Sequence, residues 1–372
     1  MTWDVAIVGA GPAGCAAAIA ARRAGASVLL LDRSSFPRDK PCGDGIAAET
    51  LDVLTDLGVT GVTDGYPPVE RLRLVAPGGG EVARRLPRPV HTVPRKVFDA
   101  RLVAAATARG AELRRHTVHE ITAGPGAITV DGSLRARVLV GADGATSTVR
   151  RHRGDRVNPS GHLALAIRGY RPATGAEQLI TTTPARWPAY AWEFPIGDGT
   201  ANVGYGEVLR GAPLTKAYLI KRLGQLLPGG EPESLRAHHL PLSTHRPAPA
   251  RGPVLLAGDA LSLINPFTGE GIFYAVLSGA LAGAAAATGP DTAGRLYTRA
   301  LRARLGRHLR HSGFATLLTK QPRVVDAAVR AARRDERIFH RMVDLGLGDG
   351  VFDLRTIGRI GAEMLPIVPP PS

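Results

Sequence analysis

The chain has 372 residues, of which 44% are hydrophobic, so it can bury a large core in two interleaved domains and is not intrinsically disordered. Its net charge is +15, but only five of the 47 basic residues are lysine, and the arginines are scattered along every segment. This pattern indicates solvated faces and no nucleic-acid partner. Two cysteines, Cys15 and Cys42, exclude a disulfide framework and favour a cytoplasmic protein. Nothing at the N-terminus is typical of a signal peptide.

The first elements follow the order strand, glycine turn, helix, strand. An apolar run at Val5–Val8 predicts a buried strand, and a second run at Val28–Leu31 predicts its parallel neighbour. Between them lies the motif Gly9-Ala10-Gly11-Pro12-Ala13-Gly14, which opens a helix. Asp32 ends the second strand, where a carboxylate accepts hydrogen bonds from ribose hydroxyls. The order predicts a Rossmann-type dinucleotide site.

Each glycine of the motif has a physical role in such a site. Gly9 permits the tight turn, Gly11 lets the backbone approach a pyrophosphate, and Gly14 lets the helix lie close to the strand. The free N–H groups at the start of the helix then attract phosphate.

The remaining elements alternate between helical and strand patterns. A breaker-rich loop, 33–46, carries Cys42-Gly43-Asp44-Gly45. Alternating residues predict a hairpin at 69–86 and strands at 162–208. The predicted helices are 47–57, 95–108, 214–227, 271–290 and most of 291–345. The tail from Pro366 to Ser372 is proline-rich and is expected to be loose.

Two later turns resemble further binding elements. A strand at Val138–Val140 delivers Asp143-Gly144, and a strand from Pro253 ends in Asp259. FAD needs ligands from such a distant segment, because its ribityl chain and ring extend past the pyrophosphate, whereas a nicotinamide cofactor does not. The helix that begins near Gly271 can direct its positive end at the flavin ring. These features favour FAD over NAD.

The uncharged segment Gly271 to Pro290 is about long enough to cross a bilayer. Its alanine and glycine content is instead typical of a helix that packs closely against a sheet. We therefore interpret it as a buried helix, and leave peripheral contact with a membrane open.

Three motifs together resemble the flavoproteins related to p-hydroxybenzoate hydroxylase. They are Gly9–Gly14 with Asp32, Asp143-Gly144 with Arg150, and Gly258-Asp259, and the resemblance covers roughly residues 1–290. Two more resemble the geranylgeranyl reductase branch. Pro41-Cys42-Gly43-Asp44-Gly45 resembles its cysteine loop, and Tyr190-x-Trp192-x-Phe194-Pro195 with Gly204-x-Gly206 resembles its substrate signature.

The resemblance implies a set of site residues. With the motif residues Gly9, Gly11, Gly14 and Asp143, the implied FAD contacts are Ala13, Asp32, Arg33, Cys42, Gly43, Gly45, Ile46, Arg95, Val118, Asp259, Gly271 and Ile272. The implied substrate residues are Tyr190, Trp192 and Phe194, although alternate positions on one strand face also suit plain core packing. We assign no metal site.

The implied fold is α/β, with a Rossmann-type FAD-binding domain, an interleaved antiparallel substrate-binding sheet and C-terminal helices. The expected FAD-binding domain comprises 1–65, 95–160 and 245–290, and the substrate domain comprises 66–94 and 161–244, followed by a helical region at 291–372.

The implied activity is reduction of C=C bonds in an isoprenoid or another hydrophobic substrate. Hydride would come from reduced flavin, and the Cys42 thiol is our candidate proton donor, although it can also be only a small turn residue. NAD(P)H, if used, would bind transiently, because the chain has no second G-x-G-x-x-G motif, and ferredoxin is another donor. Monooxygenation is the alternative chemistry, halogenation is less favoured, and a non-catalytic basic binding protein is the alternative from another class.

Overall fold

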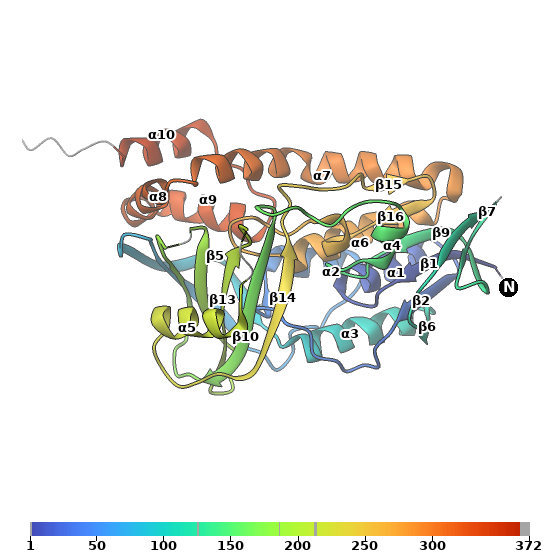
Figure 1. Ribbon diagram of the computed structural model, residues 1–372, viewed down its shortest axis with the longest axis horizontal. Coiled ribbons are helices and arrows are strands. Elements are labelled where there is room, and N and C mark those ends of the chain that lie inside the picture. The colour runs from blue at the N-terminus through green and yellow to red at the C-terminus, as the bar shows by residue number, and fades with distance from the viewer. Residues whose placement is uncertain (1, 125, 186, 212–213, 365–372) are drawn as a thin grey trace, which may run out of the picture.

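The computed structural model describes residues 2–124, 126–185, 187–211 and 214–364. The predicted loose tail, Pro366 to Ser372, lies outside these residues. Figure 1 shows two strand layers side by side, with the C-terminal helices crossing from one to the other.

The first sheet lies nearer the N-terminus and has a parallel centre in the order β6-β2-β1-β9-β16. Its strands are β1 (Thr2–Val8), β2 (Val28–Asp32), β6 (Glu112–Arg115), β7 (Ile121–Gly124), β8 (Ala127–Val130), β9 (Leu134–Gly141), β15 (Ala250–Arg251) and β16 (Val254–Leu256). The central strands are buried on both faces, which explains their continuous apolar runs.

The second sheet has the order β14-β10-β13-β12-β11-β4-β5-β3. Its strands are β3 (Gly45–Ile46), β4 (Pro68–Val75), β5 (Glu81–Thr92), β10 (Leu163–Pro172), β11 (Gln178–Thr182), β12 (Ala189–Pro195), β13 (Thr200–Val208) and β14 (Glu233–Pro241). We expected an antiparallel layer, and it is antiparallel except where β11 pairs with β4 in parallel. That pair joins strands that are far apart in the chain, so no local turn could announce it.

The helices are α1 (Pro12–Arg23), α2 (Ala48–Asp56), α3 (Arg95–Ala108), α4 (Thr148–His152), α5 (Lys216–Leu226), α6 (Ile272–Ala286), α7 (Pro290–Leu318), α8 (Pro322–Arg334), α9 (Glu336–Leu347) and α10 (Leu354–Ala362). Helices α1, α2, α3, α5 and α6 lie close to their expected positions, the stretch 291–345 is divided among three helices, and α4 and α10 were not predicted. One expectation was wrong in detail. The strand from Pro253 does not run to Asp259, because Gly258 has φ +58° and begins a short 3-10 helix, Gly258–Leu261.

The uncharged helix α6 lies directly against α1. A Cβ on Gly279 would lie 2.1 Å from the Ala13 carbonyl oxygen, and one on Gly283 would lie 2.0 Å from that of Ala17. Only glycine permits this approach, so the alanine and glycine content serves contact with a helix, whereas we expected packing against a sheet. In the described part of the chain, no helix is long and apolar enough to cross a membrane.

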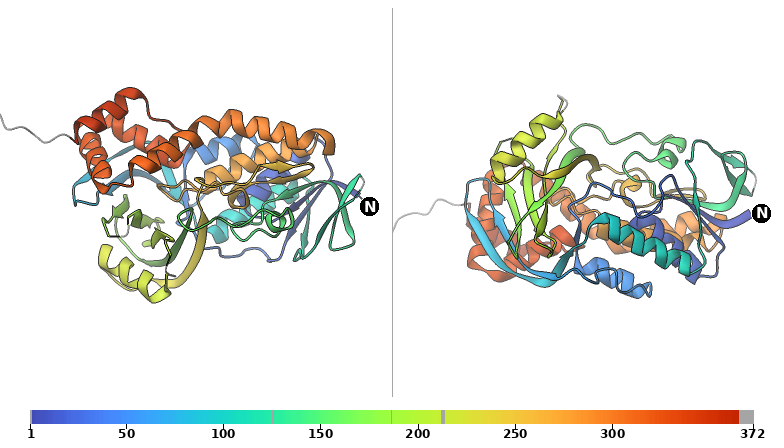
Figure 2. Two further views of the ribbon diagram at one scale, coloured as in Figure 1. Left: turned by 45° about the horizontal axis from the view of Figure 1, so that its top comes forward. Right: turned by 90° about the horizontal axis from the view of Figure 1, so that it is seen from below.

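The two sheets meet at the ends of α1 and α6. Figure 2 shows α7 running along the molecule from the first sheet toward α8, α9 and α10, which cover one side of the second sheet. Side chains of β4 and β5 form an apolar core with α8 and α9. The C-terminal helices therefore close one side of the space between the sheets.

Candidate active site

A cavity of about 170 Å³ lies where the two sheets meet, and most of the predicted site residues line it. The start of α1, which follows β1 of the first sheet, lines one side of the cavity, and β12 and β14 of the second sheet line another. Predicted residues in its lining are Gly11, Ala13, Cys42, Gly43, Gly45, Ile46, Arg95, Tyr190, Trp192, Phe194, Asp259, Gly271 and Ile272. The other predicted residues, Gly9, Gly14, Asp32, Arg33, Val118 and Asp143, lie outside the lining. Contact with FAD stays a prediction for both groups.

The glycine turn has the geometry that a phosphate cradle needs. Gly9 has φ +101°, and a Cβ there would lie 2.3 Å from the Ala142 carbonyl oxygen. A Cβ on Gly14 would lie 1.7 Å from the Gly9 carbonyl oxygen, so both positions require glycine. Gly11 is different, because the nearest atoms to a Cβ there are guanidinium nitrogens of Arg38, at 3.6 Å, and Arg95, at 3.9 Å. The turn therefore offers free space beside two cations.

The carboxylates near this turn are already held in place. Asp32 accepts hydrogen bonds from the backbone N–H groups of Ala10 and Ser34, each at 2.8 Å. Asp143 accepts from the N–H groups of Thr148, at 2.6 Å, and Val149, at 3.1 Å, at the start of α4. The Asp143 turn thus shapes the edge of the cavity through its neighbours, while its own carboxylate serves α4.

Arg95 is buried at the start of α3 and forms a two-pronged ion pair with Asp99, with its Nε 2.6 Å from Oδ1 and its second nitrogen 2.8 Å from Oδ2. Arg38 adds a contact of 3.1 Å to the same carboxylate. Such pairs hold a guanidinium in a fixed position. Positive charge is therefore fixed beside the Gly11 backbone.

The loop that carries Cys42 is tied to the second sheet through Asp44. Asp44 is fully buried, has φ +61° and accepts hydrogen bonds from Tyr170 Oη, at 2.6 Å, and Asn202 Nδ2, at 2.8 Å. Burial raises its pKa to about 6. The backbone N–H of Arg95 donates to the other oxygen at 3.3 Å. Asp44 thus fixes the loop between the second sheet and the start of α3.

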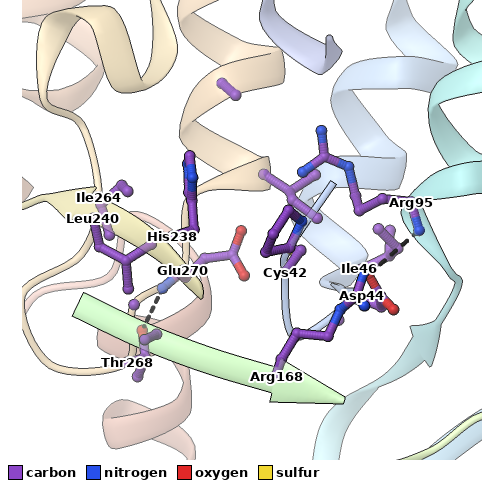
Figure 3. A pocket seen from close by; sticks show the side chains of 18 of the residues that line it. Cys42, Asp44, Ile46, Arg95, Arg168, His238, Leu240, Ile264, Thr268 and Glu270 are labelled. Carbon is purple, nitrogen blue, oxygen red and sulfur yellow. Dashed lines mark hydrogen bonds between the residues drawn. The ribbon is translucent and has the colours of Figure 1, made fainter. Parts of the chain in front are cut away.

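Two protonatable groups lie in the cavity near each other (Figure 3). Burial raises the pKa of the Cys42 thiol, which keeps it protonated at neutral pH. Burial also raises the pKa of Glu270 to about 7, and its Oε1 accepts from the Phe273 N–H at 2.8 Å. In Figure 3 the Glu270 carboxyl group points toward the loop of Cys42. Sequence reasoning missed Glu270, although an acid between Gly269 and Gly271 at a helix start was a visible signal.

Asp259 lies between two basic side chains. Its Oδ2 is 3.6 Å from Lys40 Nζ and 4.0 Å from His238 Nε2. Burial and the Lys40 charge lower the pKa of His238 to about 4, so the ring is neutral. Its Nε2 is buried and has no hydrogen-bond partner among the described residues. Because His238 lines the cavity, this nitrogen is available to a polar group of a ligand.

The aromatic signature residues lie on β12 and face the cavity. Trp192 Nε1 donates to Asn202 Oδ1 at 2.8 Å, and Tyr190 Oη donates to the Thr268 carbonyl oxygen. A Cβ on Gly204 would lie 2.1 Å from the Trp192 ring, so this glycine makes room for the indole. Phe194 lies beside the Trp192 ring, with a distance of 6.5 Å between centroids.

A second and more apolar cavity of about 290 Å³ continues from the first. We call it the apolar chamber. The two share part of their lining, namely Leu72, Ile180, Tyr190, Leu240, Thr268, Gly269 and Leu347. The chamber extends between the second sheet and the C-terminal helices, where Val325, Met342 and Phe352 line it.

These observations fit FAD. The glycine cradle with two cations suits a pyrophosphate, the helix α6 directs its positive end at the cavity from Gly271, and His238 and Asp259 offer polar atoms in its lining. No group of three or more potential metal ligands is found in the described residues.

Comparison with known proteins gives a consistent result. The family model described as FAD binding domain matches residues 2–167. Menaquinone reductase of Mycobacterium tuberculosis is 33% identical over 348 residues, which covers 86% of this chain and 85% of that protein. Digeranylgeranylglycerophospholipid reductase 1 of Methanopyrus kandleri is 32% identical over 310 residues, covering 76% of this chain and 80% of that protein.

A solved structure shares the fold over nearly the whole chain. It is a geranylgeranyl bacteriochlorophyll reductase-like protein from Thermoplasma acidophilum, with a TM-score of 0.80, 21% identity, and coverage of 98% of this chain and 97% of that one. FAD is therefore the cofactor, and the predicted fold class is confirmed. The chain belongs to the family of FAD-dependent oxidoreductases that includes the menaquinone reductases and the geranylgeranyl reductases.

Proposed function

We propose that this enzyme reduces C=C bonds in the isoprenoid chain of a lipid-soluble substrate. The observation that carries the proposal is the apolar chamber, because it continues directly from the cavity that holds Cys42 and Glu270. An apolar chain in the chamber would place one of its double bonds in the first cavity. The names of the relatives, which act on menaquinone and on geranylgeranyl lipids, point to the same substrate class.

We further propose that segments 66–94 and 161–244 form the substrate domain and that Tyr190, Trp192 and Phe194 position the chain. Tyr190 lines both cavities, so its ring stands where they join. Its hydroxyl is held by the Thr268 carbonyl oxygen, which leaves the apolar ring to face the substrate.

Reduced FAD supplies the hydride in this chemistry, and the protein must supply a proton to the neighbouring carbon. Cys42 is the proton donor in our proposal, because its thiol is held protonated by burial and lies in the cavity. Glu270 shares the cavity and can return a proton to it. NAD(P)H, or ferredoxin, is the proposed source of electrons.

The proposal is tested by anaerobic single turnover. Enzyme with photoreduced FAD is mixed with a geranylgeranyl lipid, and with the same lipid carrying a saturated chain as a control. We expect the visible flavin band to return only with the unsaturated compound, and the product to gain two hydrogen atoms. Product that contains a new oxygen atom, formed only when oxygen is admitted, would instead identify a monooxygenase.

A further inference from the structure

The last turns of α7 display apolar side chains to solvent. Phe314 and Leu317 are each 58% exposed, and Leu318 is 44% exposed. Their spacing places them on one face of the helix, and Arg307 and Arg310 continue that face toward the N-terminus. The opposite face of α7 is buried through residues such as Leu305 and Ser312. Along the helix, the outward face is therefore first basic and then apolar. The solvated face of an ordinary surface helix is polar throughout.

The same turns of α7 form a wall of the apolar chamber. Ala315, Thr316 and Thr319 line the chamber, alternating along the helix with the exposed apolar residues. Trp187 also lines it, and its indole N–H donates to the Thr319 carbonyl oxygen. The apolar surface outside and the apolar chamber inside are thus separated by one helix.

The chamber reaches the surface at this place. Two of its lining residues, Lys320 and Arg210, are exposed, and both are cationic. Arg323, at the start of α8, is exposed as well. A chamber lined by apolar groups, with cations at its exposed margin, suits a molecule whose apolar chain lies among anionic headgroups.

We propose that the α7 tip, defined as Phe314, Leu317 and Leu318, docks onto the surface of an anionic phospholipid bilayer. The apolar side chains enter the boundary between headgroups and acyl chains, and the adjacent cations, Arg307, Arg310, Lys320 and Arg323, contact lipid phosphates. Charge complementarity selects this occupant, because the exposed charged residues nearest to the tip in the chain are basic and the whole chain carries +15. Figure 1 shows that α7 ends beside α8 and α10, at the end of the molecule away from the N-terminus.

Docking at this place would put the mouth of the chamber against the bilayer, so that an isoprenoid chain could enter without crossing water. That consequence rests on the proposed function, but bilayer binding itself does not. The docking proposal and the proposed function can therefore be contradicted separately.

The test is cosedimentation of the FAD-loaded enzyme with vesicles. The vesicles contain phosphatidylcholine alone, or phosphatidylcholine mixed with phosphatidylglycerol. We expect the enzyme to bind the mixed vesicles more tightly, and added salt to weaken that preference. The double variant Phe314→Ser with Leu317→Ser should lose about tenfold or more in partition coefficient, because two apolar side chains no longer enter the interface.

A matched control lies on the same helix. Leu296 is 39% exposed and lies about 27 Å from Phe314 along the α7 axis, so Leu296→Ser should bind vesicles as the unaltered enzyme does. Arg310→Glu should weaken binding to the mixed vesicles by about tenfold and leave binding to phosphatidylcholine alone unchanged.

Equal binding by the double variant and the unaltered enzyme would overturn the proposal. So would a dimer in solution that the double variant converts to a monomer while the unaltered enzyme ignores vesicles, because the tip would then join two copies of this chain. Turnover of a detergent-solubilised substrate, measured on the same variants, reports on the proposed function. A double variant that keeps this turnover but leaves the vesicles supports docking, and no turnover in any variant contradicts only the substrate class.

Discussion

The side-chain amide of Asn202 donates a hydrogen bond to the buried carboxylate of Asp44 at 2.8 Å. The same nitrogen donates to the Cys42 carbonyl oxygen at 2.8 Å, and the amide oxygen accepts from Trp192 Nε1 at 2.8 Å. One side chain of the second sheet therefore fixes both the loop that carries the thiol and the central ring of the aromatic signature.

Replacing Asn202 with alanine should destabilise the folded protein. The change leaves the buried Asp44 carboxylate and the Trp192 N–H without this partner, and each lost buried hydrogen bond costs about 1–3 kcal/mol. Urea unfolding of the FAD-loaded enzyme measures the change, and Gln225→Ala, on an exposed turn of α5, is the control. Equal unfolding midpoints for the two variants would show that the hydrogen bonds of Asn202 do not stabilise the fold.

The free energy of unfolding should depend on pH through Glu270. Its pKa is about 7 in the folded protein against an ordinary 4.5, so the unfolded chain loses the proton first as pH rises. The raised pKa therefore stabilises the folded protein fully below about pH 4.5. This stabilisation, about 3 kcal/mol, is lost as the pH rises to about 7.

Glu270→Gln should therefore flatten the fall in stability between about pH 4.5 and 7. Urea titrations at several pH values, made without added FAD, measure this slope. Glu231→Gln, at an exposed position, should leave the slope as it is in the unaltered protein. A slope that Glu270→Gln does not alter would contradict the raised pKa.

Gly279→Ala should separate α6 from α1. The new methyl group would lie 2.1 Å from the Ala13 carbonyl oxygen, and backbone must move to accommodate it. Overpacking of this kind costs about 1–3 kcal/mol. Because α1 and α6 both present their first turns to the cavity, we also expect weaker FAD retention, measured by flavin absorbance after gel filtration.

A glycine in another helix gives the comparison. Gly224 lies in α5, with nothing within 4 Å of an added Cβ. Gly224→Ala should keep FAD and raise stability by up to about 1 kcal/mol, since alanine favours a helix. Loss of flavin from both variants would show that helix content, and not the contact of α1 with α6, controls retention.

Turnover measurements should distinguish the role of Cys42 from that of Glu270. Cys42→Ala should retain FAD and lose most single-turnover reoxidation by an unsaturated substrate, about 100-fold or more, because general acid catalysis contributes this much. Glu270→Gln should slow repeated turnover more than the first turnover if it only returns a proton to Cys42. Unchanged reoxidation in Cys42→Ala together with a large loss in Glu270→Gln would move the donor role to Glu270.

Local chemistry explains what the sequence could predict. The glycine turn needs residues without a Cβ at Gly9 and Gly14, and the structure shows a backbone oxygen within 2.3 Å of both added Cβ positions. The uncharged composition of α6 likewise predicted a buried and closely packed helix, but its close partner is helix α1 and not the expected sheet. Each of these features depends on a short run of residues, so the local sequence pattern was sufficient to predict it.

Features that depend on distant pairing were not predictable in the same way. The parallel pair of β4 with β11 depends on register between separate segments. Asp44 was recognised only as the acid of a glycine-rich turn, because its partners Tyr170 and Asn202 lie more than a hundred residues away. The role of Glu270 likewise depends on burial, which comes from Tyr190 and the Cys42 loop as much as from its own helix.

The apolar chamber takes much of its far wall from helices that do not touch the glycine turn. Ala315, Val325, Met342 and Phe352 line it and are absent from the lining of the first cavity. Larger or smaller side chains at these positions would shorten or lengthen the room for a substrate while leaving the redox centre as it is. Under the proposed function, substitutions confined to the last third of the sequence would therefore change the length of isoprenoid chain that the enzyme accepts.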